Sequence, residues 1–158
     1  MLNRLSVSLF LLLAGSALCQ EGPIHVNNKT RMLEDAQGRS VIFHGVNVVY
    51  KVAPYIPSNG TFDPDLSLTN EDIQNMVDWG FNFVRLGVMW EAVERAPGVY
   101  NDTYLDEVTK LINKLGENGI YTLVDAHQDV FARRMCGEGV PDFYVPDNEL
   151  SHKCSGFI

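Results

Sequence analysis

Polar and ionisable side chains follow an apolar segment in YTLVDAHQDVF, residues 121–131. Asp125, His127 and Asp129 alternate with uncharged residues, so an imidazole stands between two carboxylates. Such a set can hold hydroxyl groups, orient another side chain or move a proton. The alternative is a polar loop start that happens to contain a histidine.

Two further apolar segments carry polar or aromatic side chains. They are VIFHGVNVV (residues 41–49), with His44 and Asn47, and FNFVRLGVMW (residues 81–90), with Arg85 and Trp90. Arg85 needs carboxylate or carbonyl partners, because burying a guanidinium without them is costly. Trp90 could stack on a sugar ring or pack in the core. His44 and Asn47 are expected to stand at the carboxyl end of the first strand, where they could face a pocket, pack in the core or cap a loop.

The apolar segments begin near residues 41, 81 and 120, and a helical pattern fills each gap. The first helix is predicted over residues 69–80, with Thr69 as its N-cap and Gly80 as its stop. The second is predicted over residues 103–119. Strands separated by helices are typical of a parallel sheet with crossover connections.

This α/β pattern fits a doubly wound sheet or a (β/α)8 barrel. No Gly-x-Gly-x-x-Gly or Gly-Lys-Ser/Thr phosphate loop follows any of the strands, which removes the main support for a nucleotide-binding sheet. In a barrel, functional residues lie at the carboxyl ends of the strands. We also expect an N-terminal hairpin over residues 24–35, with its turn at residues 35–38.

Five blocks of the sequence stand in a specific order: FHGVNVVYK, WGFNFVRLGVMWEAVE, PGVYNDTYL, NGIYTLVDAHQDVF and CGEGVPDF. Together they resemble the N-terminal part of the endoglycoceramidases, secreted or lysosomal members of glycoside hydrolase family five. The resemblance implies a (β/α)8 TIM barrel that cleaves the bond between glycan and ceramide with retention of configuration. A typical barrel takes about 250 residues, so residues 20–158 are expected to hold three βα units of an incomplete barrel.

The resemblance also implies roles for individual residues. Arg85 would orient a nucleophilic glutamate, and His127 would line the floor of the site near the glycosidic oxygen. Lys51 and Asp129 would hold hydroxyls of the sugar next to the cleaved bond. Asp125 would face the same pocket, unless it accepts a hydrogen bond from nearby backbone. No metal or organic cofactor is implied.

The two catalytic carboxylates that the resemblance implies are an Asn-Glu pair after strand four and a glutamate after strand seven. Neither strand is recognisable in the sequence. Glu91, Glu94 and Glu138 are predicted to be exposed loop acids, and Asn148-Glu149 follows no apolar strand. Because a retaining glycosidase needs both carboxylates, the chain by itself is expected to be inactive.

Residues 1–19 predict a signal peptide, with Arg4 ahead of an apolar run that is too short to cross a bilayer. No later segment of the sequence predicts a membrane span. We therefore expect an extracellular or lysosomal protein that could touch membrane lipid transiently. The net charge is −8, and Lys and Arg form no cluster, which argues against nucleic acid as a partner.

Cys136 and Cys154 are predicted to form a disulfide, as two cysteines in a secreted chain usually do. The rival is a zinc site of His127, Cys136, His152 and Cys154, although the usual ligand spacings are missing. Three Asn-x-Thr sequons predict glycan acceptors on surface loops. Their asparagines are Asn28, Asn59 and Asn101.

The sequence thus favours a hydrolase that acts on glycosphingolipids. Another family-five β-glycosidase, such as a glucosidase or a cellulase-like enzyme, would have the same fold. A different class of protein, a non-catalytic secreted binder of sugar or lipid, is also open. If the transcript encodes a further strand that ends in Asn-Glu and a later strand that ends in Glu, the enzyme is supported. A genuine stop codon would support the non-catalytic binder or an error in the gene model.

Overall fold

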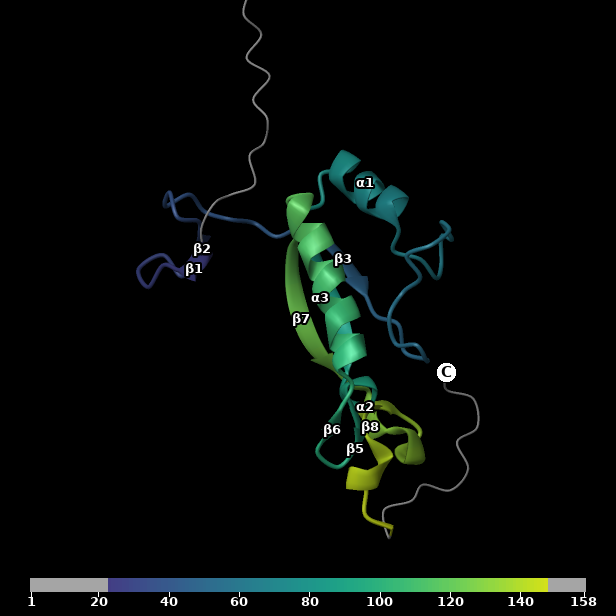
Figure 1. Ribbon diagram of the computed structural model, residues 1–158. Helices are drawn as coiled ribbons and strands as arrows, with labels where there is room; N and C mark the ends of the chain where they lie inside the picture. Colours follow the sequence, from purple (N-terminus) through teal and green to yellow (C-terminus); the bar gives the residue numbers. More distant parts are fainter. Residues whose placement is uncertain (1–22, 148–158) are drawn as a thin grey trace, which may run out of the picture.

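Three parallel strands form the centre of the protein, which a computed structural model describes over residues 23–147 (Figure 1). They are hydrogen-bonded in the order β3 (Gly45–Val48), β4 (Phe83–Met89), β7 (Tyr121–His127). The crossovers contain the helices α1 (Asn70–Asp78) and α3 (Asp102–Glu117). The predicted arrangement of parallel strands joined by helices is therefore confirmed.

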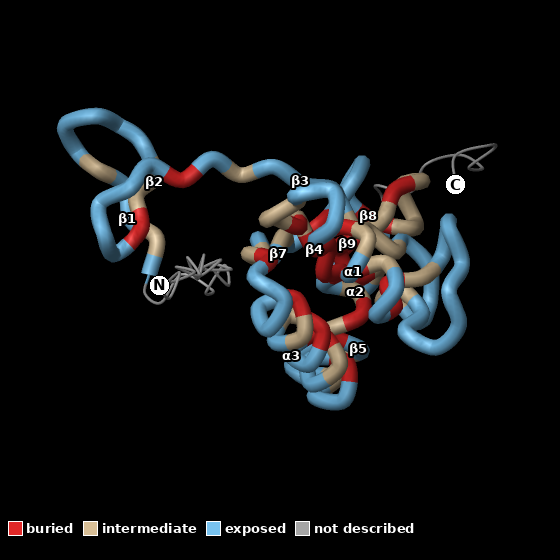
Figure 2. The backbone as a smooth tube through the Cα atoms, turned by 90° about the horizontal axis from the view of Figure 1, so that it is seen from above, coloured by how far each residue is buried: buried red, intermediate tan, exposed pale blue. Residues whose placement is uncertain are grey.

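Shorter elements precede the sheet and extend from the carboxyl ends of its strands. An antiparallel pair, β1 (His25–Val26) and β2 (Leu33–Glu34), projects away from the sheet (Figures 1 and 2). After β4 come α2 (Trp90–Val93), β5 (Glu94–Ala96) and β6 (Val99–Tyr100). After β7 come β8 (Val130–Ala132), η1 (Arg133–Met135), β9 (Glu138–Val140) and η2 (Asp142–Tyr144).

Both crossover helices begin at side-chain caps. Thr69 Oγ1 accepts from Asp72 N at 3.4 Å, and Asp72 Oδ2 accepts from Thr69 N at 2.6 Å, which makes a reciprocal capping box for α1. Asn101 caps α3 by accepting from Tyr104 N at 3.2 Å. Gly80, with φ +78°, follows α1, and this left-handed conformation favours glycine. The predicted cap and stop of the first helix are thus confirmed.

The core lies between the sheet and the two helices (red in Figure 2). Alternate residues of β4, Val84, Leu86 and Val88, are buried in it. The helices contribute Ile73, Met76, Val108, Leu111 and Leu115 to the same cluster. Because side chains alternate across a strand, Arg85 projects from the opposite face of the sheet.

The first strand begins later than predicted. The apolar pattern predicts a strand over residues 41–49, whereas β3 begins at Gly45. A continuous run of apolar residues does not indicate at which residue the hydrogen-bonded pairing of the strand begins. Pairing starts where the neighbouring backbone comes close: a Cβ on Gly45 would lie only 1.6 Å from Phe83 O.

The N-terminal hairpin is present, but its turn lies earlier than predicted. The paired strands β1 and β2 enclose residues 27–32, which form the turn. The predicted turn at residues 35–38 is a second one, in which Gly38 N donates to Asp35 O at 3.0 Å. Asp35 Oδ1 also accepts from Gln37 N at 2.9 Å, a local bond that favours turns wherever aspartate occurs.

The sheet is an open arc rather than a closed barrel. Between residues 23 and 147, β3 and β7 each have β4 as their one neighbour, whereas every strand of a closed barrel has two. Leu123 and Val124 of β7 are consequently half exposed. An incomplete barrel was the predicted fold class. None of the helices in this range is long and apolar enough to cross a membrane.

Candidate active site

Several polar residues singled out in the sequence lie within or just after β4 and β7: Arg85, Asp125, His127 and Asp129. In the register of the sheet, Gly87 lies opposite Asp125, and Met89 lies opposite His127. Arg85 precedes Gly87 by two residues and therefore shares its face. Residues opposite one another on neighbouring strands have their side chains on the same face of the sheet, so the side chains of Arg85, Asp125 and His127 project away from the helices.

Asp125 joins Arg85 to His127. Its Oδ2 lies 2.6 Å from Arg85 Nη2 and 2.9 Å from His127 Nδ1. His127 is buried, while the Arg85 side chain is 37% exposed. The carboxylate thus fixes the orientation of the imidazole and holds the guanidinium at the open face. The expected carboxylate partner of Arg85 is confirmed, and Asp125 bonds to side chains rather than to nearby backbone.

A second carboxylate lies on the other side of His127. His127 Nε2 is 3.3 Å from Asp129 Oδ2, although the two groups are not aligned as a hydrogen bond. The same oxygen accepts a hydrogen bond from Lys51 Nζ, which also lies 2.7 Å from Glu138 Oε1. These contacts make a continuous polar row: Arg85, Asp125, His127, Asp129, Lys51 and Glu138.

The contacts of Lys51 shift the pKa values of the row. The hydrogen bond from Lys51 lowers the pKa of Asp129 below its ordinary value. The bond to Asp129, followed by that to Glu138, raises the pKa of Lys51. Both groups are therefore charged at neutral pH. Lys51 and Asp129 also remain about half exposed, at 44% and 51% of their side chains, so a ligand can reach them.

Glu91 holds together the loops that carry this row. It accepts from Tyr55 Oη at 3.2 Å and from Gly139 N at 3.0 Å, and its Oε1 lies 3.0 Å from Arg133 Nη2. Arg133 also donates to the carbonyl of Lys51. Burial opposes the charge of Arg133, but the bond to Glu91 raises its pKa. Burial and the nearby Glu91 also raise the pKa of Tyr55.

Glu94, the first residue of β5, accepts hydrogen bonds from three donors. It accepts from Gly98 N at 2.7 Å, from Trp90 Nε1 at 2.7 Å and from Tyr144 Oη at 2.9 Å. The Gly98 bond is the main cause that lowers the pKa of Glu94. Trp90, whose ring lies 5.0 Å from that of Tyr144, is 43% exposed as a residue. Trp90 is therefore no core residue and has a face that a sugar could contact.

The prediction that Glu91, Glu94 and Glu138 are exposed loop acids is wrong. Glu94 is 3% exposed, and the Glu91 and Glu138 side chains are 11% and 13% exposed. The sequence around them looks like surface because their partners lie far away along the chain. Tyr144, for example, follows Glu94 by 50 residues.

His44 is not at the carboxyl end of a strand, so that expectation is also wrong. It precedes β3, its carbonyl accepts from Asn82 N at 2.9 Å, and its ring contacts that of Phe81 edge-on at 4.5 Å. Asn47 lies within β3 opposite Arg85 and is exposed. Asn47 thus shares the face of the site, and His44 does not.

Glu138 is the member of the row that the sequence analysis missed as a partner of Lys51. Its backbone pairs with that of Asp129, with N–O distances of 2.9 and 3.1 Å. The signal is the pattern Gly137-Glu138-Gly139. A Cβ on Gly137 would lie 2.1 Å from Asp129 O, and Gly139 has φ +116°. Glycines on both sides therefore indicate a close backbone approach.

Within residues 23–147, one group of side chains could hold a metal ion. His127, Asp129 and Glu138 offer three ligand atoms within 4.8 Å of one another. Lys51 Nζ already contacts both carboxylates. A cation would therefore have to displace the ammonium group, which makes a sugar hydroxyl the better matched ligand.

The rival zinc site does not fit Cys136, which is disulfide-bonded. A cysteine must be a free thiolate to ligate zinc. His152 and Cys154 lie outside residues 23–147, so the pairing of Cys136 with Cys154 stays a prediction. The predicted signal peptide (residues 1–19) and Asn148-Glu149 also lie outside this range.

The three predicted glycan acceptors differ in their surroundings. Asn28 is exposed in the turn between β1 and β2, and Asn59 is exposed in the loop after β3. Asn101 is half-buried, because Oδ1 caps α3 and Nδ2 lies 3.4 Å from Ala92 O. A glycan at any of the three stays a prediction.

Comparison with curated proteins finds endoglycoceramidases. The chain is 43% identical over 122 residues to the endoglycoceramidase of Cyanea nozakii, covering 77% of this chain and 24% of that protein. It is 39% identical over 113 residues to endoglycoceramidase I of Rhodococcus hoagii, covering 72% of this chain and 22% of that protein. The chain thus spans about a quarter of the length of these relatives.

Solved structures show the same likeness. An endogalactoceramidase superposes with a TM-score of 0.61 at 26% identity, over 77% of this chain and 30% of that chain. Endo-glycoceramidase II from Rhodococcus sp., solved as a lactosyl-enzyme intermediate, superposes with a TM-score of 0.57 at 30% identity. That match covers 70% of this chain and 26% of the other.

The sequence also matches the cellulase family, glycosyl hydrolase family 5, over residues 35–151. This span contains the three parallel strands and the whole polar row. The open arc of strands is accordingly part of the (β/α)8 barrel of that family, and its carboxyl ends are where a barrel enzyme has its active site. The chain belongs to glycosyl hydrolase family 5.

Proposed function

We propose that this protein acts in the hydrolysis of the O-glycosidic bond between an oligosaccharide and ceramide, with retention of configuration. The observation that carries the proposal is the polar row across the carboxyl ends of β4 and β7. The endoglycoceramidase relatives support the choice of substrate. The lactosyl-enzyme intermediate of the Rhodococcus enzyme supports retention, because a retaining glycosidase works through such a covalent species.

In this proposal Arg85 orients the nucleophilic carboxylate. A guanidinium presents five N–H donors, and Arg85 Nη2 holds Asp125 at 2.6 Å. The same planar group can bind a second carboxylate in a fixed geometry. Asp125 is thus a positioning residue, because it holds both Arg85 and His127 in place.

The other end of the row suits sugar hydroxyls. Lys51 donates, and Asp129 and Glu138 accept, so adjacent hydroxyls could each find a partner. The charged partners make these hydrogen bonds stronger than neutral ones. Trp90 directly follows β4 and therefore lies at the same end of the sheet. It offers an exposed aromatic face that could stack on a sugar.

A chimera tests the proposal directly. Residues 24–144 of this chain would replace the matching segment of the Cyanea nozakii endoglycoceramidase, which keeps its own remaining barrel. We expect the chimera to release oligosaccharide from a fluorescent glycosphingolipid. Arg85→Lys in the chimera should lower kcat by at least about tenfold, since Lys lacks the planar fork. Lys110→Arg on the outer helix α3 is the matched control.

The outcomes separate the alternatives. Activity on aryl β-glucosides or cello-oligosaccharides without release from glycosphingolipid would favour another family-five β-glycosidase. A folded but inactive chimera, together with binding of sugar or lipid vesicles by the 158-residue chain, would favour a non-catalytic binder. Equal loss of activity in the Arg85 and Lys110 variants would contradict the role given to Arg85.

The chain alone is expected to lack this activity. The polar row does not include the two catalytic glutamates that the family resemblance implies, one in an Asn-Glu pair after strand four and one after strand seven, and a retaining glycosidase needs both. Residues 20–158 should therefore release no glycan from a glycosphingolipid. Measurable release would overturn this assignment of supporting roles.

We further propose that the protein enters the secretory pathway and works outside the cell or in lysosomes, where it meets membrane glycolipids transiently. The predicted signal peptide, residues 1–19, supports this. Fusing residues 1–22 to a reporter protein should direct it into the medium of eukaryotic cells. Retention of the reporter in the cytosol would contradict the proposal.

A further inference from the structure

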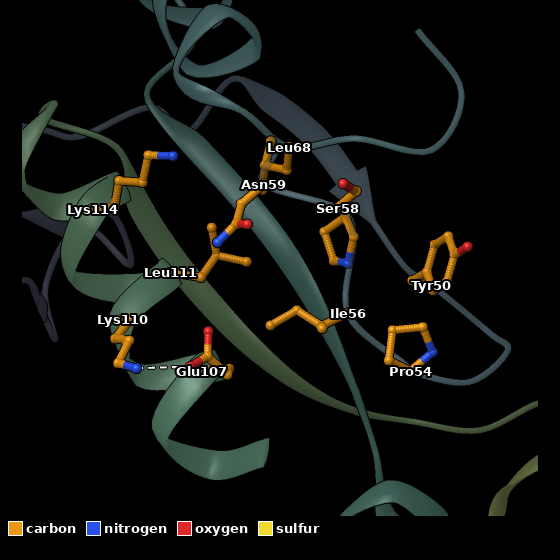
Figure 3. Close-up of a pocket in the computed structure, with 11 residues that line it drawn as sticks. Tyr50, Pro54, Ile56, Ser58, Asn59, Leu68, Glu107, Lys110, Leu111 and Lys114 are labelled. Carbon is orange, nitrogen blue, oxygen red and sulfur yellow. Dashed lines mark hydrogen bonds and ion pairs between the residues drawn. The ribbon is translucent and has the colours of Figure 1, made fainter. Parts of the chain in front are cut away.

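A cavity of about 370 Å³ lies between the loop after β3 and the side of α3 (Figure 3). No residue of the polar row lines it. Its apolar wall includes Ile56, Leu68 and Leu111, and its rim includes Glu107 and Lys110, whose charged groups lie 2.7 Å apart. The volume is within the range of about 300–1,000 Å³ that small-ligand sites have.

Asn59, the asparagine of a predicted sequon, also lines this cavity. In Figure 3 its side chain points toward α3. The preceding residue fixes its position: Ser58 N donates to Leu66 O at 3.1 Å, and Leu68 N donates to Ser58 O at 2.7 Å. Thr61, the third residue of the sequon, is exposed and is not among the residues that line the cavity.

We propose that Asn59 carries an N-linked glycan whose first N-acetylglucosamine occupies this cavity and fastens the loop to α3. In the secretory pathway the transferase joins Asn59 Nδ2 to the anomeric carbon of a lipid-pyrophosphate-linked oligosaccharide. The lipid pyrophosphate leaves, and Nδ2 gives up one proton. The sugar is thus attached at the edge of the cavity, and its short linkage to Asn59 restricts the positions that it can take.

The chemistry of the cavity matches that sugar. The N-acetyl methyl group and the C–H face of the ring can cover Leu68 and Leu111, which removes apolar surface from water. The hydroxyls and the acetamide can bond to Glu107, Lys110 and Lys114 at the rim. This proposal depends on secretion and not on hydrolysis, so the two can fail separately.

The 158-residue chain, secreted from eukaryotic cells, tests the proposal. Thr61→Ala removes the acceptor sequence without changing the cavity, and Thr61→Ser is the matched control that keeps it. An endoglycosidase that leaves one N-acetylglucosamine gives a third form. Mass spectrometry of the Asn59 peptide reports occupancy, and amide hydrogen exchange reports the stability of residues 50–60 and 107–114.

We expect Asn59 to be occupied. Exchange in both segments should be roughly fivefold faster in Thr61→Ala, the factor that corresponds to about 1 kcal/mol. Thr61→Ser and the trimmed form should match the parent chain. Asn28→Gln, which removes a sequon in an exposed turn, should leave these segments unchanged.

Four results would overturn the proposal. Asn59 could be unoccupied in the parent chain, or exchange could be equal in Thr61→Ala and Thr61→Ser. The trimmed form could also behave like Thr61→Ala, which would place the stabilising sugar further along the glycan. Chain made in bacteria, which carries no such glycan, should show no difference between Thr61 and Thr61→Ala, and a difference there would assign the effect to the threonine itself.

Discussion

At the scale of single residues, Lys51 is the group that keeps the neighbouring carboxylate of Asp129 charged. Asp129 has a lowered pKa, so its contribution to stability is complete above its ordinary value of 3.8 and is lost as the pH falls through the lower native value. Lys51 has a raised pKa, so its contribution is complete below 10.5 and is lost as the pH rises through the higher native value. The contact is therefore intact across the neutral range.

Replacing Lys51 with methionine should raise the pKa of Asp129 toward its ordinary value. Methionine keeps the length of the side chain but removes the hydrogen bond that is the main cause of the shift. Carbon-13 NMR of the carboxyl groups measures the titration directly. Lys110→Met, which removes an ammonium that pairs with Glu107, is the control. An unchanged Asp129 titration in Lys51→Met would show that the contact does not form.

At the scale of elements, the helices were predictable because their signals are local. Thr69 and Asp72 are three residues apart and form the capping box of α1. The bounds of β3 were not predictable, because they are determined by pairing with β4, which lies almost 40 residues away in the sequence. Asn101 is a different case: its sequon was recognised and its role as N-cap was not, although its bond to Tyr104 N spans only three residues.

Two substitutions separate the sequon of Asn101 from its role as N-cap of α3. Asn101→Gln removes both, whereas Thr103→Ala removes the sequon and keeps the cap. We expect Asn101→Gln to lower the free energy of unfolding by about 1 kcal/mol, the usual value of a cap, and Thr103→Ala to change it by less. Urea denaturation of chain made in bacteria gives both values without glycan. Equal effects would mean that the capping bond contributes nothing.

Substitution of glycine by alanine should have opposite effects on the stability of the chain at two positions. Gly45→Ala should disrupt the pairing of β3 with β4, because the new Cβ would lie 1.6 Å from Phe83 O. Gly116→Ala in α3 meets nothing within 4 Å and should stabilise the chain by roughly 0.5–1 kcal/mol, since alanine favours a helix. Thermal denaturation compares them. A stable Gly45→Ala protein would contradict the close approach of the two strands.

At the scale of the whole molecule, the site could be predicted in part. Asp125, His127 and Asp129 were recognisable because they are close together in the sequence and lie at the end of an apolar strand pattern. Glu91 and Glu138 were misjudged as exposed acids because their partners come from other loops. Folding brings these loops together at the carboxyl ends of the strands, which sequence periodicity does not report.

Glu91 is the clearest case of such long-range organisation. It binds Tyr55, Arg133 and Gly139, and therefore connects the loop after β3 with the segment after β7. Arg133 in turn binds the carbonyl of Lys51. Glu91 does not contact Asp129, yet the position of both partners of Asp129, Lys51 and Glu138, depends on it.

Glu91→Ala should consequently disturb a residue that it does not touch. Leaving Arg133 without its carboxylate should lower the free energy of unfolding by about 3 kcal/mol. The loosened loops should also let the pKa of Asp129 rise, as in Lys51→Met, in the same carboxyl NMR titration. Glu117→Ala, at the exposed end of α3, should change neither. If Glu91→Ala destabilised the chain while the Asp129 titration stayed as before, Glu91 would support the fold without positioning the site.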